Sequence, residues 1–207
     1  YEFRFCDWSS DVCSSDLTAH ATKLTRSVWR SANILVMKAD VPLITTNTIE
    51  NLYKKHKETN AAISFIAAHN SDPSNYSYSR VIKQGTNIYI RKKAELSLQE
   101  MQEHCCVNSG IYLISKDFLT TYIDSITKNK HTNEFHLSDL VNLATTLGKT
   151  VTMVLVPFDQ IRGIHSYQEL WAIEQIKRAE LIRYWMERGV RFSAAQTVHI
   201  EIGRAHV

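Results

Sequence analysis

The chain has 207 residues, a formal net charge of +3 at pH 7 and 44% hydrophobic residues, enough for one domain with a substantial core. Lysine and arginine are scattered rather than gathered in a basic stripe with interleaved aromatic residues, which argues against a nucleic-acid partner. No apolar run approaches the length of a transmembrane helix, so we expect no membrane partner either.

Both ends of the chain are predicted to be foreign to the protein. The oligonucleotide AGATCGGAAGAGCACACGTC, a sequencing-library adapter, encodes the terminal EIGRAHV when one G precedes it. Its reverse complement encodes DVCSSDL at residues 11–17, and the longer adapter supplies the preceding DWSS. Added segments are excluded from fold reasoning. We therefore expect residues 1–17 and 201–207 to be adapter-derived, Cys13 to have no chemical role, and the protein itself to start near Thr18, truncated at its N-terminus.

The cysteines outside these ends favour a reducing compartment. Cys105 and Cys106 are adjacent in sequence and badly placed to bridge each other. The chain shows neither a disulfide framework nor zinc-ligand spacing. We therefore expect a cytoplasmic protein.

Apolar runs predict the strands. Continuous runs without polar alternation indicate strands buried on both faces of a sheet, and they cover residues 33–40, 61–68, 106–115 and 150–156. Two further strand-like segments within residues 80–92 flank Gln84-Gly85-Thr86, a pattern typical of a hairpin.

Helical spacing and capping residues predict helices between the strands. They cover residues 45–58 with Thr46 as N-cap, 96–104, 116–128, and 134–148 with Gly148 at the C-cap. A capping box at residues 166–169 begins a last helix that ends near Arg188, before Gly189. We expect that helix to pack on its own domain rather than to form an oligomer contact. Strands alternating with helices predict an α/β fold with a mostly parallel, doubly wound sheet.

Asp40 is the last residue of the first predicted strand. Ligands of open α/β sheets bind outside the carboxyl ends of the strands. A carboxylate there is well placed to hold Mg²⁺ on a phosphate, because Mg²⁺ prefers hard oxygen ligands. An aspartate that caps the following turn is an equally good interpretation of the position alone.

Several collinear motifs resemble one bacterial family. ILVMKADVPLI is similar to a family segment ILxLxGDVPLI, and it is followed in the same order by DPSNYSYSRVI, VNSGIYLI, NEFHLSDLV and IRGIHSYQEL. The family is the bifunctional N-acetylglucosamine-1-phosphate uridyltransferase / glucosamine-1-phosphate acetyltransferase. The resemblance implies a Rossmann-like nucleotidyltransferase fold, with residues 18–188 as a partial uridyltransferase domain. Residues 189–200 would be the start of the passage to a left-handed β-helix.

The resemblance also implies a reaction. A cytoplasmic, Mg²⁺-dependent uridyltransferase would make UDP-N-acetylglucosamine from UTP and N-acetylglucosamine 1-phosphate for cell-envelope precursors, in a parent that could assemble as a homotrimer through the β-helix. Such chemistry needs in-line positioning and neutralised phosphate charge rather than a catalytic side chain. The family's glycine-rich phosphate loop has no counterpart before Asp40, so we expect this chain itself to be inactive.

The site residues carried over by position follow from the resemblance alone. Asp40 and His165 take the two metal-ligand positions, and the remaining substrate positions fall on Lys38, Ala39, Ser79, Asn108 and Ser138.

Four of the carried-over positions depart from the family. Ala39 and Ser79 replace glycines, and Ile90 replaces a glutamate that would accept hydrogen bonds from the sugar. His165 replaces an asparagine and is a poor partner for Mg²⁺; a surface histidine is an equally good interpretation. Two alternatives stay open: another sugar-1-phosphate nucleotidyltransferase, or a degenerate relative that binds a sugar nucleotide without turnover.

Overall fold

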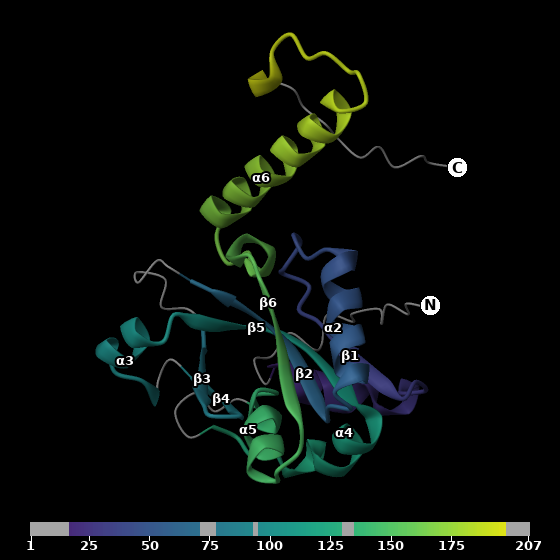
Figure 1. Cartoon of the computed structure of the whole chain (residues 1–207), viewed down its shortest axis with the longest axis vertical. Helices are drawn as coiled ribbons and strands as arrows, with labels where there is room; N and C mark the ends of the chain where they lie inside the picture. The colour runs from purple at the N-terminus through teal and green to yellow at the C-terminus, as the bar shows by residue number, and fades with distance from the viewer. Residues whose placement is uncertain (1–16, 71–77, 93–94, 130–134, 198–207) are drawn as a thin grey trace.

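The computed structural model describes residues 17–70, 78–92, 95–129 and 135–197. It shows one open sheet with helices on both faces and a last helix that extends away from the sheet (Figure 1). The strands are β1 Asn33–Val36, β2 Ile63–His69, β3 Arg80–Gln84, β4 Asn87–Arg91, β5 Cys106–Ser115 and β6 Val151–Val156. The α-helices are α1 Leu17–Leu24, α2 Thr46–Glu58, α3 Leu98–Glu103, α4 Lys116–Tyr122, α5 Asp139–Thr146 and α6 Tyr167–Met186. Short 3₁₀ turns are η2 Thr25–Val28, η4 Ile123–Ser125, η5 Phe158–Ile161 and η6 Ala195–Thr197.

The sheet differs from the expected mostly parallel arrangement. Its order is β4-β3-β5-β2-β6, with β1 beside β5. Among the described strands only β2 and β6 pair in parallel, and the other pairings are antiparallel. The reason is β5, which lies between β1 and β2 and runs opposite to both. A continuous apolar run shows that a strand is buried on both faces but does not show its direction.

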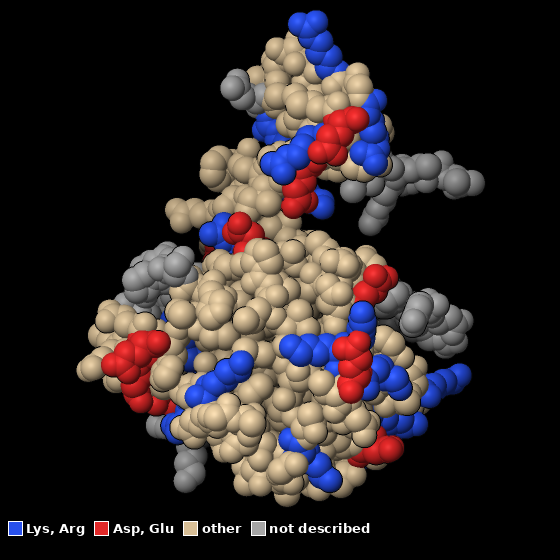
Figure 2. Space-filling model, viewed as in Figure 1, with Lys and Arg blue, Asp and Glu red and all other residues tan. Residues whose placement is uncertain are grey.

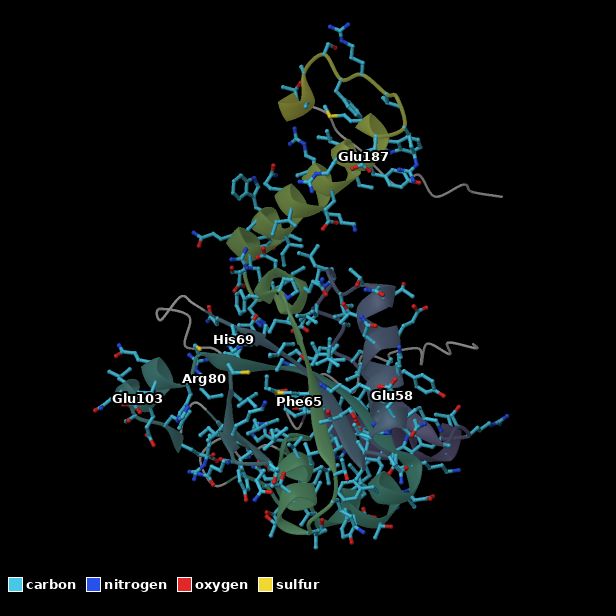
Figure 3. The ribbon with its side chains drawn as sticks, viewed as in Figure 1. Glu58, Phe65, His69, Arg80, Glu103 and Glu187 are labelled. Carbon is cyan, nitrogen blue, oxygen red and sulfur yellow. The ribbon has the colours of Figure 1, made fainter. Side chains whose placement is uncertain are left out.

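Alternating side chains of β2 fill two cores. Phe65 packs in a core with α4 and α5, and Figure 3 labels it near the centre of the sheet. Ile66, the next residue, points to the other face and packs in a core with Leu52 of α2. Successive residues of a strand face opposite sides, so β2 needs apolar residues at nearly every position, and the sequence supplies them.

Most predicted elements are confirmed, but β1 ends at Val36 instead of residue 40, and α4 ends at Tyr122 instead of residue 128. β5 has the predicted limits, and the hairpin turns at Gly85, whose φ of 62° is the left-handed conformation that glycine adopts readily. The N-cap of α2 is Thr45 rather than Thr46, because the Thr45 hydroxyl accepts the N–H of Thr48 at 3.2 Å. Residues 135–138 precede α5 as a non-helical segment instead of its first turn.

The last helix was expected to pack on its own domain, and for most of its length this is wrong. Figure 1 shows α6 leaving the sheet near the end of β6 and extending outward. Ile173 is its buried side chain, whereas Trp171 is 64% exposed. Acidic and basic side chains follow one another along this helix, while the face of the sheet body in Figure 2 carries few charges at its centre.

Some expectations fall on residues outside this description. The ends that we expect to be adapter-derived lie outside the described residues except for Leu17. Residues 71–77, which contain most of the segment before Ser79, lie outside them as well. The assignment of residues 18–188 and 189–200 to two domains stays a prediction. In the described part of the chain, none of the helices combines the length and the apolar character needed to cross a membrane.

Candidate functional site

Loops from three strands meet at one edge of the sheet. Asp40 follows the carboxyl end of β1, and His165 lies beyond β6 and η5. Because β5 runs opposite to β1 and β2, its first residues, including Asn108, lie at this same edge. The backbone N–H of Ile164 donates to the carbonyl of Asp40 at 3.0 Å and joins two of these loops. The edge is where ligands of open α/β sheets bind.

Asp40 has an oxygen available for a ligand. Its Oδ2 lies 3.9 Å from Nδ1 of His165, and the two side chains are 32% and 52% exposed. Its Oδ1 is buried and makes no hydrogen bond to any described residue. A buried carboxylate oxygen without a partner costs free energy, about 1–3 kcal/mol. This arrangement suits a cation or a donor supplied by a ligand.

Gly163 allows the close approach of His165 to Asp40. A β-carbon added at Gly163 would lie 2.7 Å from Nε2 of His165 and 3.6 Å from Oδ2 of Asp40. Any other residue at this position would therefore displace the imidazole. The motif IRGIH predicted a site residue at position 165, but the requirement for glycine two residues earlier is visible only in the structure.

Two further side chains hold the backbone on either side of His165. The hydroxyl of Tyr78 accepts the N–H of Gly163 at 3.1 Å, and the carboxylate of Glu169 accepts the N–H of His165 at 2.8 Å. Burial raises the pKa of Tyr78, whereas the hydrogen bond from His165 is the chief reason that the pKa of Glu169 is lowered. The sequence pattern indicated Glu169 only as part of a capping box. It gave no signal for Tyr78, although that residue lies in the motif DPSNYSYSRVI.

Lys38 approaches the start of β5 across a glycine. Gly110 has a φ of 81°, and a β-carbon there would lie 2.9 Å from Cε of Lys38. The alkyl stem of Lys38 thus lies over the Gly110 backbone while the residue stays exposed. Lysine is a common phosphate-binding residue that acts as a point charge. Ala39 beside it is exposed.

Asn108 makes its described side-chain contacts with the protein. It is buried, its Nδ2 donates to the hydroxyl of Tyr112 at 2.7 Å, and its Oδ1 accepts the N–H of Gly110 at 3.3 Å. Its backbone N–H donates to the carbonyl of Ser79 at 3.0 Å. These contacts shape the stretch of β5 between Asn108 and Tyr112, where the pairing with β2 shifts in register. The expected bond from Asn108 to a substrate stays a prediction, for which the second N–H of the amide remains the donor to consider.

Ser138 and Ile90 lie where α5 packs on β4. Ser138 is buried and precedes α5, which packs on β4. Ile90 of β4 is fully buried, and Asn142 of α5 accepts its backbone N–H at 2.7 Å and donates to its carbonyl at 2.9 Å. None of the contacts described for Ser138 or Ile90 involves Asp40. The role of Ser138 in binding a substrate therefore stays a prediction.

The donor set at this edge fits Mg²⁺ only through Asp40. Within the described residues no group of three or more His, Cys, Asp or Glu side chains could hold a metal ion. Mg²⁺ is commonly held by one or two carboxylates together with substrate phosphates and water. The unpartnered Oδ1 of Asp40 meets that requirement, whereas the imidazole of His165 offers a nitrogen, which Mg²⁺ does not favour.

Comparison with known proteins gives a consistent result. No protein-family model matches the chain. Bifunctional protein GlmU of a Nitratiruptor species is 29% identical over 175 residues, which cover 84% of this chain and 39% of that protein. Bifunctional protein GlmU of Thermotoga petrophila is 29% identical over 184 residues, 88% of this chain and 40% of that protein. The chain thus spans about two fifths of the length of these curated relatives.

Solved structures agree on the fold. A Bacillus anthracis protein assigned as a glucose-1-phosphate thymidylyltransferase, in complex with a sucrose, superposes with a TM-score of 0.58 at 15% identity, covering 88% of this chain and 65% of that one. CMP:2-keto-3-deoxy-manno-octonic acid synthetase complexed with CTP gives a TM-score of 0.55 at 13% identity, covering 86% and 70%. The resemblance to the bifunctional uridyltransferase / acetyltransferase is therefore confirmed, and the chain has a Rossmann-like nucleotidyltransferase fold.

Proposed function

We propose that this chain provides the nucleotidyl-transfer part of a Mg²⁺-dependent uridyltransferase that makes UDP-N-acetylglucosamine from UTP and N-acetylglucosamine 1-phosphate. The observation that carries the proposal is Asp40, a carboxylate with an unpartnered oxygen at the edge where the loops after β1 and β6 meet the start of β5. The similarity to GlmU proteins supports the choice of reaction.

In this proposal Asp40 holds Mg²⁺ through Oδ1, and substrate phosphates and water complete the ligand set. Bound there, the ion neutralises phosphate charge and orients the triphosphate. His165 is retained as a second candidate ligand, because its Nδ1 lies 3.9 Å from Oδ2 of Asp40. Since Mg²⁺ prefers oxygen, His165 would more effectively donate a hydrogen bond to a phosphate oxygen.

The remaining residues bind and orient in this proposal. Lys38 adds a positive charge close to Gly110, where the sugar phosphate would lie beside Asp40. The phosphate of the sugar attacks the α-phosphate of UTP and pyrophosphate leaves, so the protein's contribution is to hold the two in line and to offset their charge. Asn108 and Tyr78 keep the turns around this site in place. Ser79 and Ala39 would present backbone to the sugar nucleotide.

The experiment is an assay of pyrophosphate release from UTP and N-acetylglucosamine 1-phosphate, using the full-length protein restored from independent reads of the flanking DNA. We expect turnover that requires Mg²⁺ and that falls by at least about a hundredfold in Asp40→Asn. Glu58→Gln is the matched control, because Glu58 is a 61% exposed carboxylate at the C-terminal end of α2. If the restored protein releases no pyrophosphate, the uridyltransferase proposal is rejected.

A second candidate function follows from Ile90. This residue is fully buried and its backbone is bonded to Asn142, so the position offers no acceptor to a sugar. The candidate is transfer to a different sugar 1-phosphate, or binding of a sugar nucleotide without turnover. Replacing N-acetylglucosamine 1-phosphate with glucose 1-phosphate, and UTP with dTTP or CTP, separates these cases: turnover with one of these substrates supports the first, and binding without release supports the second.

A further inference from the structure

A hollow of about 290 Å³ lies at the amino end of β5, and both described cysteines line it. Its other lining residues include His69 at the end of β2, Lys83 of β3 and Leu155 of β6. It shares no lining residue with the Asp40 loop. Figure 3 labels His69 at this part of the sheet, near Arg80, with Glu103 on the outlying α3.

The two thiols have different surroundings. Cys105 is exposed, and its Sγ lies 3.6 Å from Nδ1 of His69, which is exposed as well. The N–H of Asn70 donates to the carbonyl of Cys105 at 2.8 Å and fixes the backbone opposite His69. Cys106 is half-buried, and burial raises the pKa of its thiol. A thiolate is the reactive form of cysteine. Cys105 is the candidate nucleophile, because it is exposed and an imidazole nitrogen that can accept its proton lies 3.6 Å from its Sγ.

We propose that Cys105 is a thiol-modification site, at which His69 accepts the thiol proton and the adjacent hollow receives the substituent of a small organic disulfide. The thiolate of Cys105 attacks one sulfur of the disulfide. A new S–S bond forms as the S–S bond of the reagent breaks, and the second sulfur leaves as a thiol that takes up the proton from His69. Cys105 is oxidised and the reagent is reduced by the same two electrons. The site is independent of the proposed nucleotidyl transfer.

The geometry explains why this chemistry favours a small substituent. The hollow is bounded on one side by Leu155, which is 49% exposed, and on another by Lys83. Glu103 and His104 also line it, so the charges around Cys105 are of both signs. A volume of about 290 Å³ holds a substituent of a few tens of atoms at most, comparable with the lower end of small-molecule pockets.

The test measures the rate at which 5,5′-dithiobis(2-nitrobenzoate) modifies each thiol. The full chain contains four cysteines, so Cys6→Ser and Cys13→Ser are made first to leave Cys105 and Cys106. We expect Cys105→Ser to remove the fast phase and Cys106→Ser to keep it. We expect His69→Ala to slow the fast phase about tenfold, with His69→Asn as a second variant that keeps a polar side chain at the strand end.

Two controls make the result decisive. His104→Ala removes an imidazole that lines the same hollow but makes no described bond to Cys105, and it should leave the rate unchanged. Leu155→Trp narrows the hollow, and it should slow modification by 5,5′-dithiobis(2-nitrobenzoate) while leaving alkylation by the smaller iodoacetamide unaffected. Equal rates at Cys105 and Cys106, an unchanged rate in both His69 variants, or no effect of Leu155→Trp on either reagent would overturn the proposal.

Discussion

The bond between Asn108 and Tyr112 gives the sharpest test of how the start of β5 is built. Nδ2 of Asn108 donates to the Tyr112 hydroxyl at 2.7 Å, and both residues are buried. Tyr112→Phe removes the hydroxyl and leaves a buried N–H without this partner. Such a loss costs about 1–3 kcal/mol of unfolding free energy. Asn108→Ala leaves the hydroxyl unpaired in the same way and also removes the acceptor for the N–H of Gly110.

The two single variants should therefore not be additive. Each one breaks the same bond, so the double variant should lose less than the sum by about 1 kcal/mol. Urea denaturation followed by far-UV circular dichroism measures all four free energies. Tyr53→Phe on α2 is a matched control, because Tyr53 is 40% exposed. This variant should change the unfolding free energy by no more than about 0.5 kcal/mol.

A coupling energy below about 0.3 kcal/mol would refute the reasoning, since it would mean that Asn108 and Tyr112 act independently. Asn108 would then be free to act mainly on a ligand, as the family resemblance implies. A coupling of the expected size means that Asn108 has a primary role in shaping β5 around Gly110, whatever it also does for a substrate.

Three further predictions concern pH and packing. Burial, the largest influence, raises the pKa of Tyr112 above its ordinary 10.0. The contribution of the neutral Tyr112 side chain to stability is therefore present below pH 10 and is lost as the pH rises further. The loss of unfolding free energy at alkaline pH, measured by urea denaturation, should be smaller in Tyr112→Phe. Burial and then the charge of Lys57 lower the pKa of His56, whose ring is hydrogen-bonded to Ser64 at 2.7 Å. The unfolding free energy should therefore fall as the pH drops below about 6.5. A His56→Gln variant that loses the same unfolding free energy at acid pH would contradict this. Gly163→Val should displace the His165 ring with a small loss of stability, because the half-exposed ring can move; an unchanged His165 signal in an NMR spectrum would be the opposing result.

Sequence patterns were sufficient for most of the elements that follow residue 32 and for the place of Asp40 beyond the carboxyl end of β1. The apolar run of β5 and the glycine turn of the hairpin depend on neighbouring residues, which explains why their limits were predicted closely. The direction of β5 relative to β1 and β2 was not predicted, because it depends on which strands become neighbours in space. Asp40 was placed correctly at the strand edge, since that position follows from the strand limit alone.

The contacts within the site could be identified only from the structure, not from the sequence. Gly163 and Gly110 matter because of what lies over them, His165 and Lys38, and no sequence pattern records such a close approach. Likewise, the family resemblance implies a sugar contact for Ser138. The structure places Ser138 directly before α5, which packs on β4. A resemblance transfers residue positions, but the side-chain environment at each position depends on residues that differ between the two proteins.

We propose that the edge of the sheet around Asp40 is a nucleotidyl-transfer site. The most direct test is Mg²⁺-dependent release of pyrophosphate from UTP and N-acetylglucosamine 1-phosphate by the restored full-length protein, compared between wild type and Asp40→Asn. We predict turnover in the wild type and a loss of at least about a hundredfold in the variant, because the carboxylate with the unpartnered oxygen would no longer hold the ion. Equal turnover in the two proteins would contradict the assignment of Asp40.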